Sequence, residues 1–200
     1  MQIGSYSPWG KIQHIEKIAP GIAHVSTAGH GGFKLDRAQN ALVPKPLRRK
    51  GGWYEEDCAY AAVAVTFHQG AGFSCEAVEI ARRTLKDYYP DQYTEAFGEP
   101  VTLEESGVLR DRAAFEARRD QLVSVAGYGS WHETVPSGMV GVVAHKGGRD
   151  GAGRVHGPAQ FFLVPEEEYK AARRNGVVVD PARHPAWSGP KQWEGVTDAP

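Results

Sequence analysis

The first part of the chain alternates apolar and polar positions in two arms around a tight turn. "KIQHIEKIAPGIAHVSTA" carries β-branched residues on both sides of Ala19–Gly21, and a proline followed by glycine is typical of a turn. This pattern predicts an N-terminal β-hairpin. "GHGG", at residues 29–32, is expected to end the second strand. Asp36 is a suitable N-cap for a short helix that stops before Pro44.

The middle of the chain changes to helical patterns. Residues from about Glu55 to Phe67 are apolar on nearly every face, which predicts a helix buried at the centre of the fold. Ser74 is expected to cap the next helix, whose apolar positions recur every three to four residues. A third, more highly charged helix is predicted over residues 111–123.

The last part of the chain returns to strand patterns. Four strands are predicted, at 122–129, 138–148, 159–165 and 176–180, together with one short helix at 166–174. Strands near both ends and helices between them predict an α+β fold. We expect a single compact domain over 1–200, with a buried central helix, a mainly antiparallel sheet and an irregular tail over 182–200.

Composition and charge restrict the class of protein. The chain is 41% hydrophobic and 24% charged, which fits a soluble domain with a substantial core. Its formal charge of −1 argues against non-specific nucleic-acid binding and against mimicry of DNA. Apolar runs stay well below the roughly 18 residues of a membrane span, and no signal-peptide pattern is visible. With only two cysteines, neither in a CxxC pattern, we expect a cytoplasmic protein.

"GGWYEEDC" places three acids, Glu55, Glu56 and Asp57, directly before the apolar segment. A carboxylate at the start of a helix is favoured by the helix dipole and can accept hydrogen bonds from free amides. That role explains one of the acids, and we predict Asp57 for it. Trp53 and Tyr54 beside a glycine turn are typical of a lined pocket, which leaves at least one acid for a functional role.

Two histidines are candidate partners for these acids. His30 lies between glycines, which leave room for a ligand or carboxylate to approach, and we predict that Glu55 or Glu56 faces it. His132, in "GYGSWHETVPSGM", has a similar setting. If they meet the acids in space, they form a general acid/base site or a His/carboxylate metal site. The alternative for each is an ordinary surface histidine, and the spacing matches no recognised metal motif.

Cys58 precedes the same apolar segment, in a position that resembles the nucleophile of cysteine hydrolases. In those enzymes a helix N-terminus and a histidine stabilise the thiolate. Here the three preceding acids favour the neutral thiol instead, and Cys58 falls on the apolar stripe. We therefore predict a small, inert core residue.

Several blocks carry a resemblance to a known but uncharacterised family. They include "VSTAGHGGFKL", "GGWYEEDCAYAAVAV", "SWHETVPSGMVGVVA" and "FFLVPEEEY", and they resemble the signature blocks of a domain found in phage and plasmid proteins. The resemblance implies a mobile-element context and no known chemistry. By analogy, it favours an accessory protein that binds and modulates a host factor, for example in counter-defence of an antirestriction kind.

The alternative is a small hydrolase or transferase. It would use His30 with Glu55, Glu56 or Asp57, around a divalent metal or without one. Because no catalytic motif is complete, the sequence leaves both hypotheses open. It names neither a substrate nor an individual partner, and it does not indicate an oligomeric state.

Overall fold

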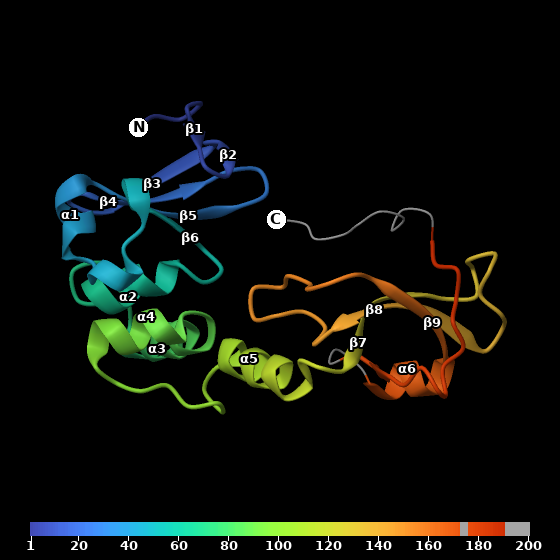
Figure 1. Ribbon diagram of the computed structural model, residues 1–200. Coiled ribbons are helices and arrows are strands. Elements are labelled where there is room, and N and C mark those ends of the chain that lie inside the picture. The colour runs from blue at the N-terminus through green and yellow to red at the C-terminus, as the bar shows by residue number, and fades with distance from the viewer. Residues whose placement is uncertain (173–175, 191–200) are drawn as a thin grey trace. The chain divides into compact units, whose positions relative to one another are not determined.

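A computed structural model describes residues 1–172 and 176–190 of the chain (Figure 1). Helices and antiparallel sheets are both present, so the predicted α+β class is confirmed. The chain divides into two compact units, Met1–Leu109 and Arg110–Pro200, where one domain over 1–200 was expected. Each unit has a sheet and helices of its own.

A four-stranded antiparallel sheet, in the order β3-β4-β5-β6, forms the first unit's framework. Its strands are β3 (His14–Ala19), β4 (Ile22–Ser26), β5 (Gly31–Leu35) and β6 (Trp53–Glu55). β3 and β4 pair around the predicted turn, so the N-terminal hairpin is confirmed. A separate two-stranded ribbon precedes the sheet and consists of β1 (Tyr6–Ser7) and β2 (Gly10–Lys11).

The glycines of "GHGG" belong to a second hairpin. Ser26 at the end of β4 pairs with Gly31 at the start of β5, so the chain turns at residues 27–30 and continues as a strand. Gly32 follows with a positive φ of 153°, and a Cβ there would lie 2.6 Å from Cη2 of Trp9. A glycine is therefore needed at this position for the close approach of the indole ring.

The helices of the first unit cover one side of the sheet. They are α1 (Arg37–Leu42), the 3-10 turns η1 (Lys45–Leu47) and η2 (Lys50–Gly52), α2 (Tyr60–Phe67), α3 (Cys75–Tyr88) and α4 (Pro90–Phe97). Both predicted N-caps are confirmed: Asp36 accepts a hydrogen bond from the Gln39 N–H at 2.8 Å, and Ser74 accepts one from the Ala77 N–H at 3.1 Å.

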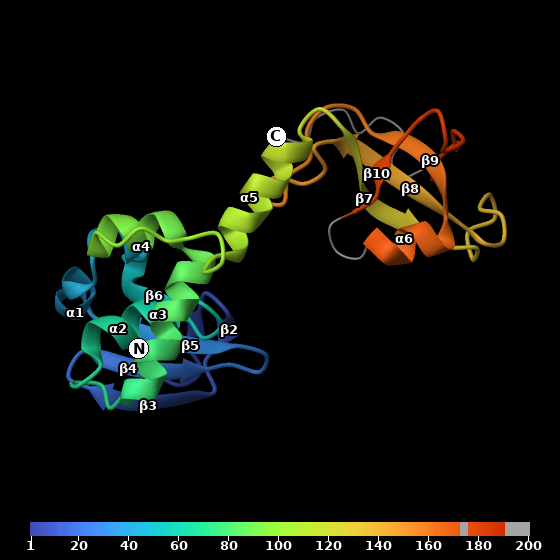
Figure 2. The same cartoon turned by 90° about the horizontal axis from the view of Figure 1, so that it is seen from below.

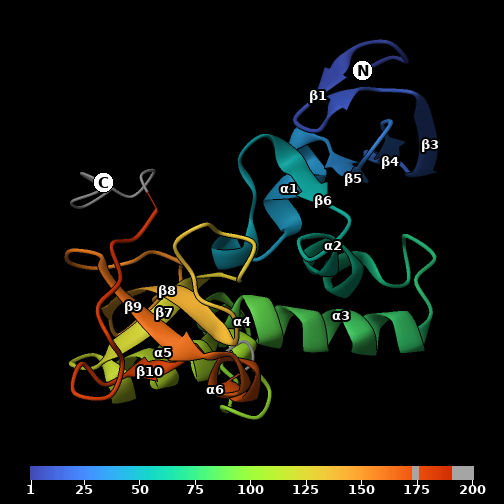
Figure 3. The same ribbon diagram turned by 90° about the vertical axis from the view of Figure 1, so that its right-hand side faces the viewer.

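α2 is the central helix, lying between the sheet and α3 (Figures 1 and 3). Residues Ala61–Ala64 are buried in the core of the unit, as their apolar character predicts. The helix begins at Tyr60 and not at Glu55, because Glu55 still pairs in β6 and residues 56–59 form turns.

The second unit contains an antiparallel sheet in the order β10-β7-β8-β9. Its elements are the larger part of α5 (Gly107–Arg118), which begins in the first unit, followed by β7 (Leu122–Tyr128), β8 (Met139–Lys146), β9 (Gln160–Pro165), α6 (Glu166–Ala172) and β10 (Val178–Val179). α6 packs on one face of this sheet (Figure 2). The four predicted strands are present, whereas the predicted helix over 111–123 begins and ends earlier, as α5.

The described part of the C-terminal tail lacks helices and strands but packs closely on the second unit. Ala186 forms an isolated bridge with Phe162, and Trp187 is only 8% exposed. The rest of the predicted tail, residues 191–200, lies outside the described residues. Among the helices of the described residues, none has both the length and the apolar character needed to cross a membrane.

Candidate metal centre

His30 is held by the turn between β4 and β5. The Thr27 N–H donates to the His30 carbonyl at 2.8 Å, and the His30 N–H donates to Thr27 Oγ1 at 3.2 Å. These bonds fix the backbone of His30, while its imidazole remains 38% exposed. The next residue, Gly31, leaves space for an acid, because a Cβ there would lie 2.5 Å from Glu56 Oε2.

Glu56 occupies that space and faces the imidazole. Its Oε1 lies 3.1 Å from His30 Nδ1, which confirms the prediction that Glu55 or Glu56 faces this histidine. When neutral His30 donates from Nδ1 to Glu56, its Nε2 carries the free lone pair. Nε2 points to the other side of the ring and lies 3.6 Å from Asp57 Oδ2. Glu56 therefore selects the ring nitrogen that is available to a metal or a proton.

Glu55 caps the turn that leads into α2. Its Oε1 accepts hydrogen bonds from the Cys58 and Ala59 N–H groups at 2.8 and 2.7 Å, and its Oε2 accepts one from the Asp57 N–H. The prediction that Asp57 has this role is wrong. Glu55 leaves β6 with a side chain long enough to reach forward to the free amides, whereas the Asp57 carboxylate lies beside His30.

The electrostatic surroundings keep Glu55 charged. Partial burial alone would raise its pKa, but the three amide donors and nearby His30 together outweigh burial, so that the pKa lies below its ordinary value. A carboxylate that is both immobilised and ionised is a suitable metal ligand.

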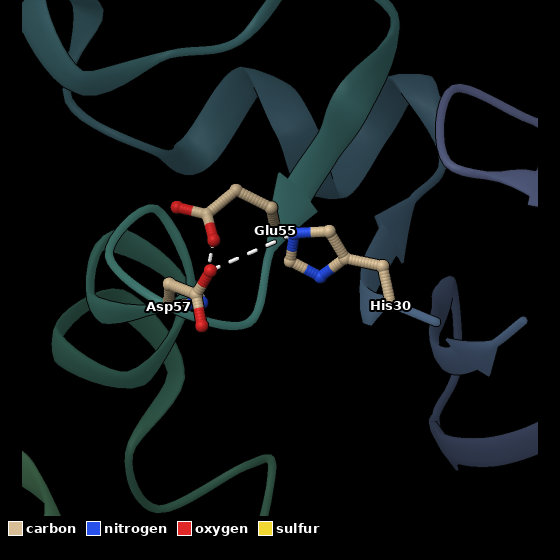
Figure 4. Close-up of side chains that lie close together, drawn as sticks. All are labelled: His30, Glu55 and Asp57. Carbon is tan, nitrogen blue, oxygen red and sulfur yellow. Dashed lines mark hydrogen bonds and ion pairs between the residues drawn. The ribbon is translucent and has the colours of Figure 1, made fainter. Parts of the chain in front are cut away.

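His30, Glu55 and Asp57 form a compact group of possible ligands (Figure 4). Each offers one ligand atom, and these atoms all lie within 4.8 Å of one another. One imidazole nitrogen with two carboxylate oxygens suits divalent cations such as Mn²⁺ or Zn²⁺. The Asp57 side chain is 73% exposed, so the outer side of the group is open to water.

A pocket of about 310 Å³ borders the group and shares Glu55 with it. Its other lining residues are Pro8, Trp9, Arg49, Lys50, Trp53, Ala59 and Tyr89. Trp53 was predicted to line a pocket, and it does. Tyr54, predicted for the same role, is fully buried instead, and its hydroxyl donates to Asn40 Oδ1 at 2.7 Å. Trp9 comes from the distant β1–β2 segment and could not be assigned to the pocket from the sequence.

Comparison with known families places this site in a defined domain. A family described as a domain of unknown function, DUF7007, matches residues 2–119. The chain belongs to the DUF7007 family. No curated protein and no solved structure matches the chain. The DUF7007 match covers the first unit from residue 2 onward and all of α5, and therefore includes the His30 group and the pocket.

Cys58 of the DUF7007 domain is half-buried beside the acids. Burial raises the pKa of its thiol, and the negative charges of Glu55, Asp57 and Asp87 raise it further. Both effects favour the neutral thiol at neutral pH, so the structure offers no basis for a thiolate nucleophile at this position.

His132 lies in the second unit, beyond the DUF7007 match. Its ring contacts Tyr128 and Trp187, with ring centroids 5.6 and 5.4 Å away, and its Nδ1 is 3.1 Å from the Thr134 hydroxyl. The structure therefore groups His132 with aromatic residues of its own unit, and it is not a member of the His30 group.

Proposed function

We propose that the DUF7007 domain of this chain is a divalent-cation-dependent enzyme, a hydrolase or transferase, with His30, Glu55 and Asp57 as its metal ligands. The observation that supports this proposal is the convergence of three ligand atoms within 4.8 Å, with Glu56 on the opposite nitrogen of the imidazole. Histidines that bind metals usually donate their other ring N–H to a carboxylate or carbonyl. The Glu56–His30 pair has this arrangement.

The three consecutive acids then have separate roles. Glu56 orients the imidazole, Glu55 is a ligand held in place by backbone amides, and Asp57 is the ligand on the solvent-exposed side. Two carboxylates so close together repel each other, and a cation between them would remove that repulsion. The run "EED" thus fits a metal site better than a helix cap alone, since a cap needs only one acid.

Three protein ligands leave coordination positions open for water and substrate, as catalytic centres require. A bound divalent cation lowers the pKa of a coordinated water and can polarise a substrate oxygen. The neighbouring pocket would hold the rest of the substrate, and Glu55, which lines both the pocket and the centre, connects the two.

Calorimetric titration of the full chain with Mn²⁺ tests this proposal. We expect one site that is lost in His30→Ala and Asp57→Ala, with melting temperatures close to that of the wild type. Glu56→Gln should weaken binding about 10- to 100-fold, as is usual for a residue that orients a ligand. Glu95→Gln, which changes an exposed acid on α4, is the matched control. Absence of Mn²⁺ and Zn²⁺ binding, or unchanged binding in Asp57→Ala, would refute the metal centre.

A second candidate function rests on the other unit. We propose, as the alternative, that this chain is a phage or mobile-element accessory protein that binds and modulates a host factor, in counter-defence for example, through Trp131. This side chain is 75% exposed and lies against Tyr128 and His132, and aromatic residues are enriched in protein interfaces. Affinity capture from host lysate with wild-type protein and Trp131→Ala should then differ in one identified partner; identical captures would count against this role.

A further inference from the structure

The pocket beside the His30 group has walls built from aromatic rings. Trp9 and Trp53 meet edge to face, with ring centroids 5.5 Å apart and planes at 86°, and Tyr89 lines the same pocket. Trp9 also approaches the imidazole of His30, at 6.2 Å between centroids. The aromatic walls thus extend up to the proposed metal ligand.

Two positively charged side chains also line this pocket. Arg49 and Lys50 line it and are exposed to solvent, and the guanidinium of Arg49 lies 4.9 Å from the centre of the Tyr89 ring. Because Arg49 rests on an aromatic ring, its charge is held at the pocket and not distributed over a freely moving side chain. Among the described residues that line the pocket, Glu55 is the acid, and its carboxylate is also a proposed ligand of the adjacent cation.

Aromatic walls, the positive charges of Arg49 and Lys50 and the adjacent proposed cation centre together suit a ligand with two different ends. A purely apolar ring would leave Arg49 and Lys50 without a role, and a simple inorganic anion would not use Trp9 and Trp53. A planar ring stacks on aromatic side chains, and a phosphate suits Arg, Lys and a divalent cation.

We propose that this pocket binds a mononucleotide, with its base against the aromatic walls and its phosphate toward Arg49, Lys50 and the cation. The inference rests on the proposed cation centre and names the substrate class of that same site. The pocket volume of about 310 Å³ is at the small end for ligand pockets, which favours a single nucleotide over a strand. The formal charge of −1 also argues against a nucleic-acid strand as the ligand.

Binding of adenosine 5′-monophosphate to the full chain in saturating Mn²⁺, measured by calorimetry, tests the inference. Adenosine lacks the phosphate, and ribose 5-phosphate lacks the ring. We expect ribose 5-phosphate to bind at least about tenfold more weakly than the nucleotide, because stacking of one base on aromatic residues is worth about a factor of ten or more. Adenosine should also bind at least about tenfold more weakly, because it loses the charge-assisted contacts of the phosphate. Removal of Mn²⁺ should weaken nucleotide binding as well.

Variants distinguish nucleotide binding in the pocket from Mn²⁺ binding at the cation centre. Arg49→Gln together with Lys50→Gln, and separately Trp53→Leu, should weaken nucleotide binding at least about tenfold while leaving Mn²⁺ binding unchanged. Lys45→Gln, an exposed lysine of η1 outside the pocket, is the control and should bind like the wild type. If Trp53→Leu lowers the melting temperature, Trp53→Phe replaces it, with a smaller expected loss.

The outcomes distinguish failure of the inference from failure of the proposed function. If Mn²⁺ binds through His30 and Asp57 but the nucleotide does not, the mononucleotide inference is wrong and the cation centre stands. If ribose 5-phosphate binds as tightly as the nucleotide, or if Mn²⁺ has no influence on the nucleotide, the inference is also wrong. If Mn²⁺ itself does not bind, the proposed function fails and the inference fails with it.

Discussion

Glu55, Glu56 and Asp57 are neighbours in sequence, yet each meets a different chemical environment. Glu55 is the last residue of β6 and reaches forward to three amides. Glu56 remains tied to β5 through its N–H, which donates to the Gly31 carbonyl at 3.1 Å, and its carboxylate meets His30 Nδ1. Asp57 is already in the turn and lies beside Nε2. The change from strand to turn within these three residues separates their roles.

This division predicts the effect of removing each acid on stability. Glu55→Ala should lower the free energy of unfolding by about 1–2 kcal/mol, the usual cost of a lost N-terminal cap, because three amides lose their acceptor. Asp57→Ala should change it by less than about 0.5 kcal/mol, as expected at an exposed position. Urea unfolding at neutral pH measures both. A larger loss in Asp57→Ala than in Glu55→Ala would contradict the assignment of the cap.

Glu55 should also contribute to the loss of stability in acid. Its pKa in the folded protein lies below the ordinary value of 4.5, so the unfolded chain binds more protons than the folded protein does in this range. Stability from Glu55 is therefore complete above the ordinary pKa and is lost as the pH falls through the folded pKa. Glu55→Gln should show a shallower decrease in unfolding free energy below about pH 4.5. An unchanged or steeper decrease would contradict the lowered pKa.

At the scale of secondary structure, α2 connects the site to the core. Glu55 and Asp57 lie just before its first residue, Tyr60, and its middle, Ala61–Ala64, is buried between the sheet and α3 (Figure 3). The same helix thus supplies the rigidity that a metal site needs.

Charges placed on α2 should show how deeply each position is buried. Ala62→Asp and Val63→Asp should each cost more than about 3 kcal/mol through a buried, unpaired charge, since these residues are 3% and 0% exposed. Val65 is only half-buried, so Val65→Asp should cost less. Melting temperatures measured by circular dichroism rank the three variants by their loss of stability. Near-equal values for Ala62→Asp and wild type would show that the helix is peripheral.

Elements with strong local signals could be predicted from the sequence. The proline–glycine turn gave the first hairpin, and Asp36 and Ser74 marked two helix starts, because turns and caps depend on neighbouring residues only. β5 and β6 were missed. β5 begins with two glycines and β6 has three residues, so their strand conformation depends on pairing with β4 and with each other, and pairing between distant segments leaves little local signal.

The candidate site, like the secondary structure, could be predicted from the sequence only in part. The glycines around His30 indicated room for a carboxylate, and Glu56 is found there. Which acid accepts hydrogen bonds from the turn before α2 was not predictable, since a glutamate at the end of a strand can reach forward to these amides. Trp9 contributes a wall of the pocket from a remote ribbon, and such a contact is visible only in three dimensions.

At the scale of the whole molecule, the boundary between the two units could not be predicted from the sequence, because it falls inside a helix and not in a recognisable linker. The boundary lies at Leu109–Arg110, within α5, and not in a linker rich in proline and glycine. The start of α5 is anchored to the first unit: Ser106 is fully buried, and its hydroxyl donates to the Asp87 carbonyl at 2.9 Å. The family match ends just after this helix.

Residues 1–119 should therefore fold and bind the cation without the second unit. This fragment keeps the first unit, the whole of α5 and every residue of the His30 group and its pocket. We expect a single cooperative thermal transition, as small domains show, and an affinity for Mn²⁺ within about twofold of that of the full chain, since all three proposed ligands belong to the fragment. The same fragment with His30→Ala is the control and should unfold at nearly the same temperature without binding Mn²⁺. A fragment that unfolds without cooperativity would show that the first unit needs the second to fold, and a cooperative fragment that does not bind would show that the second unit contributes to the centre.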